Sequence, residues 1–311
     1  MQAENILLTV FTPTFNRVQL LPKLYQCLLD QTFRRFEWLI VDGGDDGSDR
    51  LVELWQREEK ISIRYIRQNS KGLHGAYNDG AYHAIGELFL VIHSDDSCVP
   101  ETLMIFSKVW EDVPCVSRQD LSGIWGRCMD LNGKMIGPSF GVKTLKTSYH
   151  QMLFGRGFSC EMFPMVRTSV MREFPFPILE GARFIPEGFV WSAIGLKYDT
   201  LFIDIPLRRY TSIDDVKPGN DKLTDPAVLQ KNSGAILLYY RTTLVRDIGW
   251  WITAPLMFFR IAAAYSYYSF ISGKSIADQL NALPLQSVFI YLIAFPVGFC
   301  KYLGLRLKSE N

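Results

Sequence analysis

The N-terminal part of the chain alternates between short apolar runs and segments with helical spacing. Strands are predicted where the apolar runs lie, at 7–12, 38–41, 61–66 and 88–92. Helices are predicted where apolar residues recur every three or four positions, at 20–28, 51–59 and 76–85. Strands that alternate with helices form a mostly parallel sheet with right-handed crossovers. The pattern therefore predicts an α/β, Rossmann-like fold in which helices flank the sheet.

The last part of the chain is much more apolar, and the change begins at about Gly234. Between 248 and 270 the only charged residue is Arg260, and between 280 and 300 there is none. As a helix, either stretch is long enough to cross the roughly 30 Å hydrocarbon core of a bilayer. We therefore expect region 235–311 to be helical and to associate with a membrane. A buried helical pair in a soluble domain and an oligomer interface are the alternatives.

Polar residues in the first apolar stretch follow a seven-residue spacing. On a continuous helix they would share one face: Arg246, Thr253, Arg260, Tyr267 and Lys274. Aromatic residues typical of a membrane interface accompany them: Trp250, Trp251, Phe258 and Phe259. Because an arginine at the bilayer centre costs about 2.5–3.5 kcal/mol, helices that lie in the interface are expected slightly ahead of a spanning hairpin. The basic residues that follow suit anionic headgroups: Lys301, Arg306 and Lys308.

Charge and cysteine usage narrow the function class. The chain has 33 Lys and Arg against 32 Asp and Glu, a formal net charge of +1. This balance argues against a nucleic-acid partner, which requires a strongly basic face. The six cysteines show no CxxC spacing, so free thiols in a reducing compartment are expected. No signal-peptide pattern opens the chain, and we expect the N-terminal part to remain cytoplasmic.

Polar residues follow three of the predicted strands. Thr12, Asp42 and the pair Asp95–Asp96 lie at strand ends, and parallel strands end at one edge, where α/β proteins bind ligands. Two adjacent carboxylates repel each other unless a positive charge lies beside them. A divalent cation that carries a diphosphate would supply that charge. The alternative is a simple turn, since Ser94 to Ser97 has good turn chemistry. The histidines show no ligand spacing, and His93 is expected only to support the pair.

Four short motifs occur in a fixed order along this half. They are Phe11-Thr12-Pro13-Thr14-Phe15-Asn16-Arg17, Leu39-Ile40-Val41-Asp42-Gly43-Gly44, Lys71-Gly72 with Asn78, and Ser94-Asp95-Asp96. Together they resemble the family 2 glycosyltransferases of bacterial surface-polysaccharide synthesis, clearly over 7–100 and more loosely to about Thr211. The resemblance implies a GT-A fold, a nucleotide-sugar donor, Mn²⁺ or Mg²⁺, and inversion at the anomeric carbon. It implies a nucleotide-sugar-binding half at 1–110 and an acceptor and catalytic half at 111–234.

The resemblance also implies roles for single residues. Thr12, Pro13 and Thr14 match the loop that holds the nucleoside, and Asp42 matches the acid that binds the base, usually uracil. Asp95 and Asp96 match the metal-binding pair of the DxD-type motif, with Asp96 the more direct ligand. Arg17 and Lys71 are expected beside the diphosphate, or else as surface charges. Asn78 is expected to contact the donor or to pack its helix.

Transfer to a hydroxyl also requires a general base within hydrogen-bond reach of that hydroxyl. The family usually places it in a Glu-Asp pair before an aromatic helix, and 184–191 occupies that position here. Gly188 replaces the Asp, so Glu187 is the expected base, with Asp204, Asp214 and Asp215 in reserve. As an alternative, Glu187 only stabilises a helix N-terminus. Residues expected at the acceptor are Trp191, Arg208, Arg209 and Tyr210, with a core tryptophan and a basic surface pair as alternatives.

The expected function is therefore that of an inverting hexosyl- or N-acetylhexosaminyltransferase. It would move sugar from a nucleotide sugar, with UDP favoured, to a saccharide on polyprenyl diphosphate at the cytoplasmic face of the bacterial inner membrane. One alternative is a polyprenyl-phosphate glycosyltransferase with spanning C-terminal helices. Another is a non-catalytic nucleotide-sugar-binding protein, which the glycine at position 188 would suit.

Overall fold

The protein divides into two compact units. A computed structural model describes residues 6–69, 71–210 and 226–309. One unit, here the sheet unit, comprises Met1–Tyr149, Ser159–Ile178 and Ala193–Pro218. The other, the helical unit, comprises His150–Phe158, Leu179–Ser192 and Gly219–Asn311. Two internal segments, 150–158 and 179–192, thus belong with the C-terminal helices, which the pattern along the chain did not predict.

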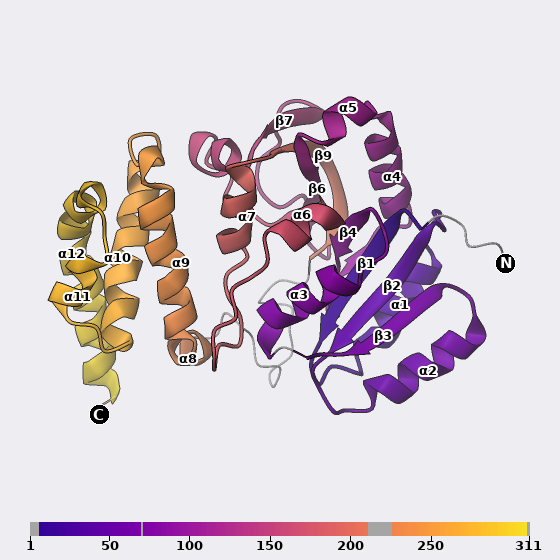
Figure 1. Ribbon diagram of the computed structural model, residues 1–311, viewed down its shortest axis with the longest axis horizontal. Coiled ribbons are helices and arrows are strands. Elements are labelled where there is room, and N and C mark those ends of the chain that lie inside the picture. Colours follow the sequence, from indigo (N-terminus) through magenta and orange to yellow (C-terminus); the bar gives the residue numbers. More distant parts are fainter. Residues whose placement is uncertain (1–5, 70, 211–225, 310–311) are drawn as a thin grey trace. The chain divides into compact units, whose positions relative to one another are not determined.

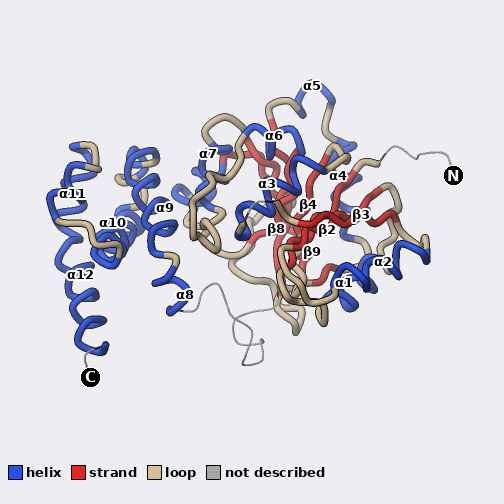
Figure 2. The backbone as a smooth tube through the Cα atoms, turned by 60° about the horizontal axis from the view of Figure 1, so that its bottom comes forward, coloured by secondary structure: helices blue, strands red, loops and turns tan. Residues whose placement is uncertain are grey.

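Nine strands of the described sheet unit form one sheet (Figure 2). Their order is β3-β2-β1-β4-β8-β6-β9-β5, and β7 pairs with β9. The strands are β1 (Leu8–Thr14), β2 (Phe36–Asp42), β3 (Ser62–Arg67), β4 (Leu88–Val91), β5 (Ser97–Cys98), β6 (Leu121–Met129), β7 (Thr144–Ser148), β8 (Met162–Arg167) and β9 (Asp199–Arg209). The first four run parallel, as predicted. The other half is mixed, because β8 runs antiparallel to β4 and β6.

Helices cover both faces of this sheet (Figure 1). They are α1 (Leu21–Leu29), α2 (Ser48–Glu58), α3 (Gly72–His83), α4 (Thr102–Asp112), α5 (Cys115–Arg118) and α6 (Thr168–Glu173). One core contains apolar residues of α1, α2 and α4 together with alternate residues of the strands. On the other face, Phe11 packs edge-on against Tyr77 of α3 at 5.4 Å. A Cβ atom at Gly80 would lie 2.4 Å from the Phe11 ring, so glycine permits this close approach.

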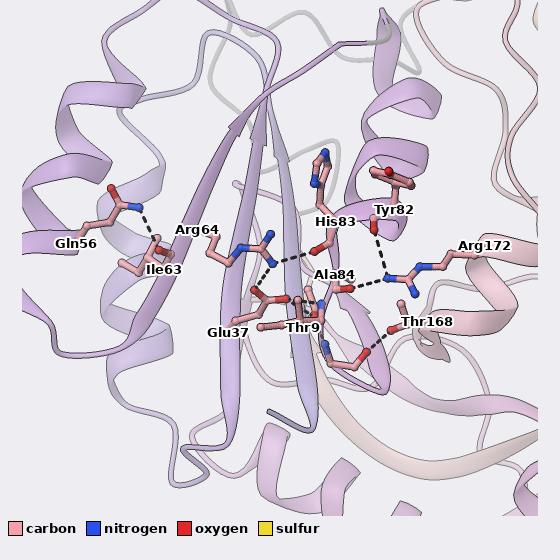
Figure 3. A network of polar contacts seen from close by, with 12 residues as sticks. Thr9, Glu37, Gln56, Ile63, Arg64, Tyr82, His83, Ala84, Thr168 and Arg172 are labelled. Carbon is pink, nitrogen blue, oxygen red and sulfur yellow. Dashed lines mark hydrogen bonds and ion pairs between the residues drawn. The ribbon is translucent and has the colours of Figure 1, made fainter. Parts of the chain in front are cut away.

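A buried polar network fixes α3 against the sheet, at the end where β1 and β2 begin (Figure 3). Glu37 is fully buried and accepts hydrogen bonds from Thr9 Oγ1 (2.6 Å) and Arg64 Nη1 (2.9 Å). The Arg64 guanidinium also donates to the carbonyl of His83, and Arg172 donates to the carbonyl of Ala84. The network therefore holds the C-terminal end of α3. The N-terminal end of α3 lies at the edge of the sheet where the parallel strands end.

The helical unit is built around α9, α10 and α12. Its elements are η1 (Gln151–Gly155), α8 (Pro226–Lys231), α9 (Ser233–Arg246), η3 (Ile248–Trp250), α10 (Pro255–Ile271), α11 (Ile276–Asn281) and α12 (Leu285–Ser309). The helix α7 (Gly188–Gly195) begins in this unit. Helices α10 and α12 pack together closely (Figure 1). A Cβ at Gly298 of α12 would lie 2.4 Å from the carbonyl oxygen of Ala263 in α10, so the glycine permits this close approach.

The expected continuous helix over 248–270 is wrong. The chain leaves helical geometry at Ala254, and α10 begins at Pro255. Tyr267, expected on a polar face, is buried, and its ring lies 4.7 Å from the Lys301 ammonium. The seven-residue spacing therefore does not mark one wet helical face.

Candidate functional site

Three potential metal ligands gather at the edge of the sheet where β4 ends. His93, Asp95 and Asp96 each offer a ligand atom, and these atoms all lie within 4.8 Å of one another. The backbone N–H of Asp96 donates to the His93 carbonyl at 3.1 Å, so the segment is also a tight turn. Carboxylate oxygens together with an imidazole nitrogen suit Mn²⁺, and the carboxylates alone suit Mg²⁺. The structure thus adds His93 itself to the predicted pair.

Two arginines neutralise this acidic pair. Arg17 Nη1 lies 3.0 Å from Asp95 Oδ2, and Arg208 Nη2 lies 2.6 Å from Asp96 Oδ2. The Asp96 and Arg208 side chains are both buried, whereas the Arg17 pair is partly exposed. Arg208 was expected at the acceptor, but its guanidinium lies against the predicted metal ligand. The short strand β5 brings it there, since Ser97 and Cys98 pair with Arg209 and Arg208.

The residues that follow Arg208 in the sequence differ in their surroundings. The Tyr210 ring lies 5.0 Å from the Arg208 guanidinium, and its burial, with the nearby Glu161, Asp96 and Asp95, raises the pKa of Tyr210 to about 12. Tyr210 therefore belongs to the surroundings of the acidic pair. Arg209 is exposed.

Asp42 ends β2 at the same edge of the sheet. Its Oδ1 accepts from the Gly44 N–H at 2.7 Å, and its Oδ2 accepts from the Tyr65 hydroxyl at 2.8 Å. Burial raises the pKa of this carboxyl group, and only 1% of the residue is exposed. At Gly44 a Cβ would lie 2.4 Å from the Asn16 backbone nitrogen, so this loop packs tightly on the one after β1. Asp42 is thus held rigidly at the edge, as a base-recognition residue would need to be.

The two threonines of the first loop differ. Thr12 accepts a hydrogen bond from Trp38 Nε1 at 2.9 Å and is fully buried, so its side chain holds the loop to β2, and the role of this loop at the nucleoside stays a prediction. Pro13 is buried beside it. Thr14 is 5% exposed, and its hydroxyl has no hydrogen-bond partner among the described residues. An unsatisfied buried hydroxyl at a ligand-binding edge is a candidate ligand contact.

Helix α3 begins at the same edge and carries the remaining predicted donor residues. Lys71 is exposed and directly precedes the helix. Asn78 donates to the Phe176 carbonyl (2.8 Å) and accepts from the Phe176 N–H (2.9 Å), so its side chain packs α3 against that segment, which is the alternative given for it above. Sequence reasoning missed His74, which is 1% exposed with neither ring nitrogen hydrogen-bonded among the described residues. Burial lowers its pKa.

Glu187 directly precedes α7 and is partly exposed. Its carbonyl accepts the N–H groups of Val190 and Trp191, both at 3.0 Å, and so starts the helix. Trp191 is only 6% exposed, so its ring is largely covered and the expected stacking on a sugar is not supported. The reserve base Asp204 is bound by Arg127 and Ser139, which indicates a structural role. Asp214 and Asp215 lie outside the described residues.

Comparison with known proteins identifies the domain that carries the acidic pair. Residues 9–126 match the family described as Glycosyl transferase family 2. This region of the chain is a family 2 glycosyltransferase domain. The crystal structure of residues 1–349 of S. aureus TarS in complex with UDP-GlcNAc is similar, with a TM-score of 0.59 and 17% identity. The similarity covers 93% of this chain and 79% of that one, and establishes the GT-A fold.

Two named relatives extend the comparison beyond the glycosyltransferase domain. The Escherichia coli UDP-Glc:α-D-GlcNAc-diphosphoundecaprenol β-1,3-glucosyltransferase WfgD is 22% identical, over 61% of this chain and 70% of the relative. The Campylobacter jejuni GalNAc(5)-diNAcBac-PP-undecaprenol β-1,3-glucosyltransferase is 25% identical, over 53% of this chain and 52% of the relative. The chain therefore spans about half the length of the second relative.

Helix α12, outside the matched domain, has two apolar faces. Its inner face packs in the helical unit through buried residues such as Ile290, Tyr291 and Ala294. Its outer face is exposed and apolar, with Leu285, Phe289, Leu292, Ile293, Val297, Leu303 and Leu307. Among the described residues it is the one helix long and apolar enough to cross a membrane: Leu285–Leu307 has a mean hydropathy of 1.8 and is 22% buried in its most apolar window.

The aromatic residues expected at a membrane interface have other surroundings. Phe258 is fully buried in the core of the helical unit, so its assignment to a membrane surface is wrong. Trp250 stacks on His150, with ring centroids 6.2 Å apart, and Trp251 packs edge-on against Phe289 of α12. Phe259 is partly buried beside the same core, and Arg260 is exposed. The exposed apolar surface described above therefore lies on α12 and not on these aromatics.

Proposed function

We propose that this chain is an inverting glycosyltransferase that moves a sugar from a UDP-sugar to a saccharide carried on polyprenyl diphosphate. The product would enter the assembly of a cell-surface polysaccharide. The observation that carries the proposal is the group His93, Asp95 and Asp96, set at the edge of a GT-A sheet between two arginines. The names of both relatives, which include undecaprenol-linked saccharides, support the acceptor class.

On the donor side, Asp95 and Asp96 would hold Mn²⁺ or Mg²⁺, with His93 as a further ligand for Mn²⁺. The ion, when bound, neutralises the diphosphate and so stabilises it as a leaving group. Arg17 and Arg208 are close enough to the carboxylates to bind phosphate oxygens in the same place, and arginine is well suited to phosphate. Asp42 would accept a hydrogen bond from the nucleobase, and the Thr14 hydroxyl would find a partner on the nucleoside.

On the acceptor side, Glu187 would act as the general base. The acceptor hydroxyl oxygen attacks the anomeric carbon from the side opposite the diphosphate, and its proton passes to the Glu187 carboxylate. The bond from the anomeric carbon to the diphosphate oxygen breaks, and UDP leaves with the electron pair. Attack from the opposite side inverts the anomeric configuration.

The lipid carrier of the acceptor requires the enzyme to work at a membrane surface. The outer face of α12 offers an apolar surface about 33 Å long, at a rise of about 1.5 Å per residue. Exposed Lys301 and Arg306 follow near its C-terminal end, where anionic headgroups would bind them. We propose that α12 docks the protein on the cytoplasmic face of the bacterial inner membrane.

A direct test uses the full chain, a panel of nucleotide sugars, Mn²⁺ or Mg²⁺, and a synthetic polyprenyl-diphosphate saccharide. We expect one UDP-sugar to give a glycosylated lipid with an inverted linkage. The Glu187→Gln variant should bind that donor normally and turn over about 10²-fold more slowly. If the protein binds nucleotide but transfers sugar from none of the donors, it binds nucleotide sugars without transferring them, and the proposal fails. Normal turnover by Glu187→Gln would place the base elsewhere.

A further inference from the structure

The backbone on either side of Glu187 is held by side chains from the C-terminal helices. Asn232 directly precedes α9 and is 3% exposed. Its Nδ2 donates to the Phe184 carbonyl at 2.7 Å, and its Oδ1 accepts from the Arg183 N–H at 2.9 Å. One buried amide therefore fixes the chain a few residues before Glu187.

A second contact holds the chain just after Glu187. Arg246, at the end of α9, donates from Nη2 to the Phe189 carbonyl at 3.1 Å, and its guanidinium lies 5.6 Å from the Phe189 ring. The Nε of Arg246 donates to Asp247 Oδ1, also at 3.1 Å. The arginine thus links the first turn of α7 to the acidic group described next.

A buried cluster secures α7 itself. Ser192 donates to Asp247 Oδ2 at 2.7 Å, and His150 Nε2 lies 3.1 Å from Asp247 Oδ1 and 2.9 Å from the Ser192 hydroxyl. All three residues are at most 3% exposed. Hydrogen bonds from His150 and Ser192 and the charge of Arg246 outweigh burial and hold the pKa of Asp247 below its usual value. The carboxylate therefore stays charged in the interior and anchors the helix.

We propose that Asn232, Arg246 and Asp247 are positioning residues for the general base. The helical unit, which presents the apolar face of α12, thereby also carries the proposed base together with the side chains that position it. The inference rests on the proposed role of Glu187. It adds that the C-terminal helices serve catalysis directly, by fixing the backbone from Arg183 to Ser192.

The physical basis is the sensitivity of proton transfer to position. A base displaced by about 1 Å can lose about 10²-fold in rate. Asn232 and Arg246 bind main-chain atoms on opposite sides of Glu187 in the sequence. These contacts restrain the backbone that carries the Glu187 carboxylate. Their loss should therefore lower kcat and leave donor binding, which is assigned to the sheet unit, unchanged.

The test compares Asn232→Ala and Arg246→Met with Arg241→Ala in the full chain. Arg241 lies on the same helix but donates to the Ala282 carbonyl, away from Glu187. We expect the two positioning variants to lose about 10- to 10²-fold in kcat, with the affinity for UDP and Mn²⁺ unchanged, and Arg241→Ala to match the wild type. Arg246→Lys, which keeps a cationic donor, should retain part of the kcat that Arg246→Met loses. This comparison tests the proposal even if Asn232→Ala does not fold.

A double-mutant cycle separates positioning from general stability. In the Glu187→Gln background there is no base left to misplace, so Asn232→Ala should cause no further loss of kcat. A further loss of about 10-fold in that background would overturn the positioning role, as would equal losses in all three single variants. If Glu187→Gln alone retains normal turnover, the proposed base has failed, and that result is distinct from failure of the positioning role.

Discussion

The guanidinium of Arg208 lies 2.6 Å from the carboxylate of Asp96, and both side chains are buried. Asp96 is the expected metal ligand, and the Arg208 guanidinium balances the charge of its carboxylate within the protein. A cation and a diphosphate that bind there would replace one charge partner with another. The pairing explains how two adjacent carboxylates remain at the sheet edge in the absence of the donor.

Loss of Arg208 should therefore destabilise the protein most when no metal is present. Arg208→Met leaves Asp96 buried without its charge partner, which typically costs about 3–5 kcal/mol. We expect a lower unfolding temperature that Mn²⁺ with UDP raises more than in the wild type. The exposed neighbour supplies the control, since Arg209→Met should unfold like the wild type. Equal unfolding temperatures for the two variants would contradict the structural importance of the pair.

Loss of Asp96 should instead weaken donor binding through the metal. Asp96→Asn removes a charged ligand, and we expect the affinity for UDP in the presence of Mn²⁺ to fall by at least about 10-fold, or about 1.4 kcal/mol. Calorimetry with and without Mn²⁺ measures the metal-dependent part. Asp45→Asn alters an aspartate that is 99% exposed and should leave binding unchanged. UDP affinity that survives in Asp96→Asn with Mn²⁺ present would refute the assignment.

Asp42 should show opposite effects on stability and on binding. Burial raises its folded-state pKa, so its ionisation becomes unfavourable to the fold as pH rises through that pKa. The Asp42→Asn variant avoids this ionisation and should be at least as stable as the wild type at pH 7. As pH falls, the free energy of unfolding of the wild type should rise relative to that of the variant. The affinity for UDP should fall, since the nucleobase loses a charged hydrogen-bond acceptor on the protein. Thermal unfolding from pH 4 to pH 8, with and without UDP, measures both effects.

The sequence predicted the strands that matter most for the site. Continuous apolar runs such as 88–92 are strong strand signals, and polar residues at their ends lie at one edge by geometry alone. Arg208 could not be assigned in this way. Its contact with Asp96 depends on β5, a strand of two residues that carries no periodic pattern. Long-range pairing of so short a strand is decided by tertiary packing.

The C-terminal region was harder to predict for a different reason. Its composition is apolar on every face, so periodicity could not separate residues that pack inside from those that face outward. One available signal was Pro255, since proline is favoured in the first turn of a helix and pushes the preceding residue out of helical geometry. The contacts of Asn232 with Arg183 and Phe184 had no sequence signal, because the partners are main-chain atoms 49 and 48 residues away, respectively.

Two thiols near the site should differ in reactivity. Cys27 Sγ lies 3.4 Å from Cys98 Sγ, and the hydrogen bond from Cys98 lowers the pKa of Cys27 to about 7. Alkylation of Cys27 should therefore rise with a midpoint near pH 7. Cys98→Ala removes the hydrogen bond and should move that midpoint toward the usual value of about 8.5. Mass spectrometry of the peptide that contains Cys27 gives the rates, and a midpoint that Cys98→Ala does not move would exclude this cause.

The outer face of α12 should determine membrane binding. Removal of the C-terminal helices would be a poor test, because it would also remove the contacts of Asn232 and Arg246 with the segment that carries Glu187. Point substitutions avoid this problem. Leu292 and Ile293 are 57% and 54% exposed, so Leu292→Lys with Ile293→Lys adds charge to the outer face without touching the core. Each buried lysine would cost up to about 2.5–3.5 kcal/mol in lipid.

We therefore expect the double variant to unfold at the wild-type temperature but to lose flotation with vesicles that contain anionic lipid. Its donor binding should be normal, and transfer to a long-chain polyprenyl acceptor should fall much more than transfer to a short water-soluble analogue. Exposed leucine elsewhere provides the control: Leu196→Lys, at a residue of the sheet unit that is 61% exposed, should float like the wild type. If the double variant floats equally well, α12 does not dock the protein, and its outer face must be covered in another way.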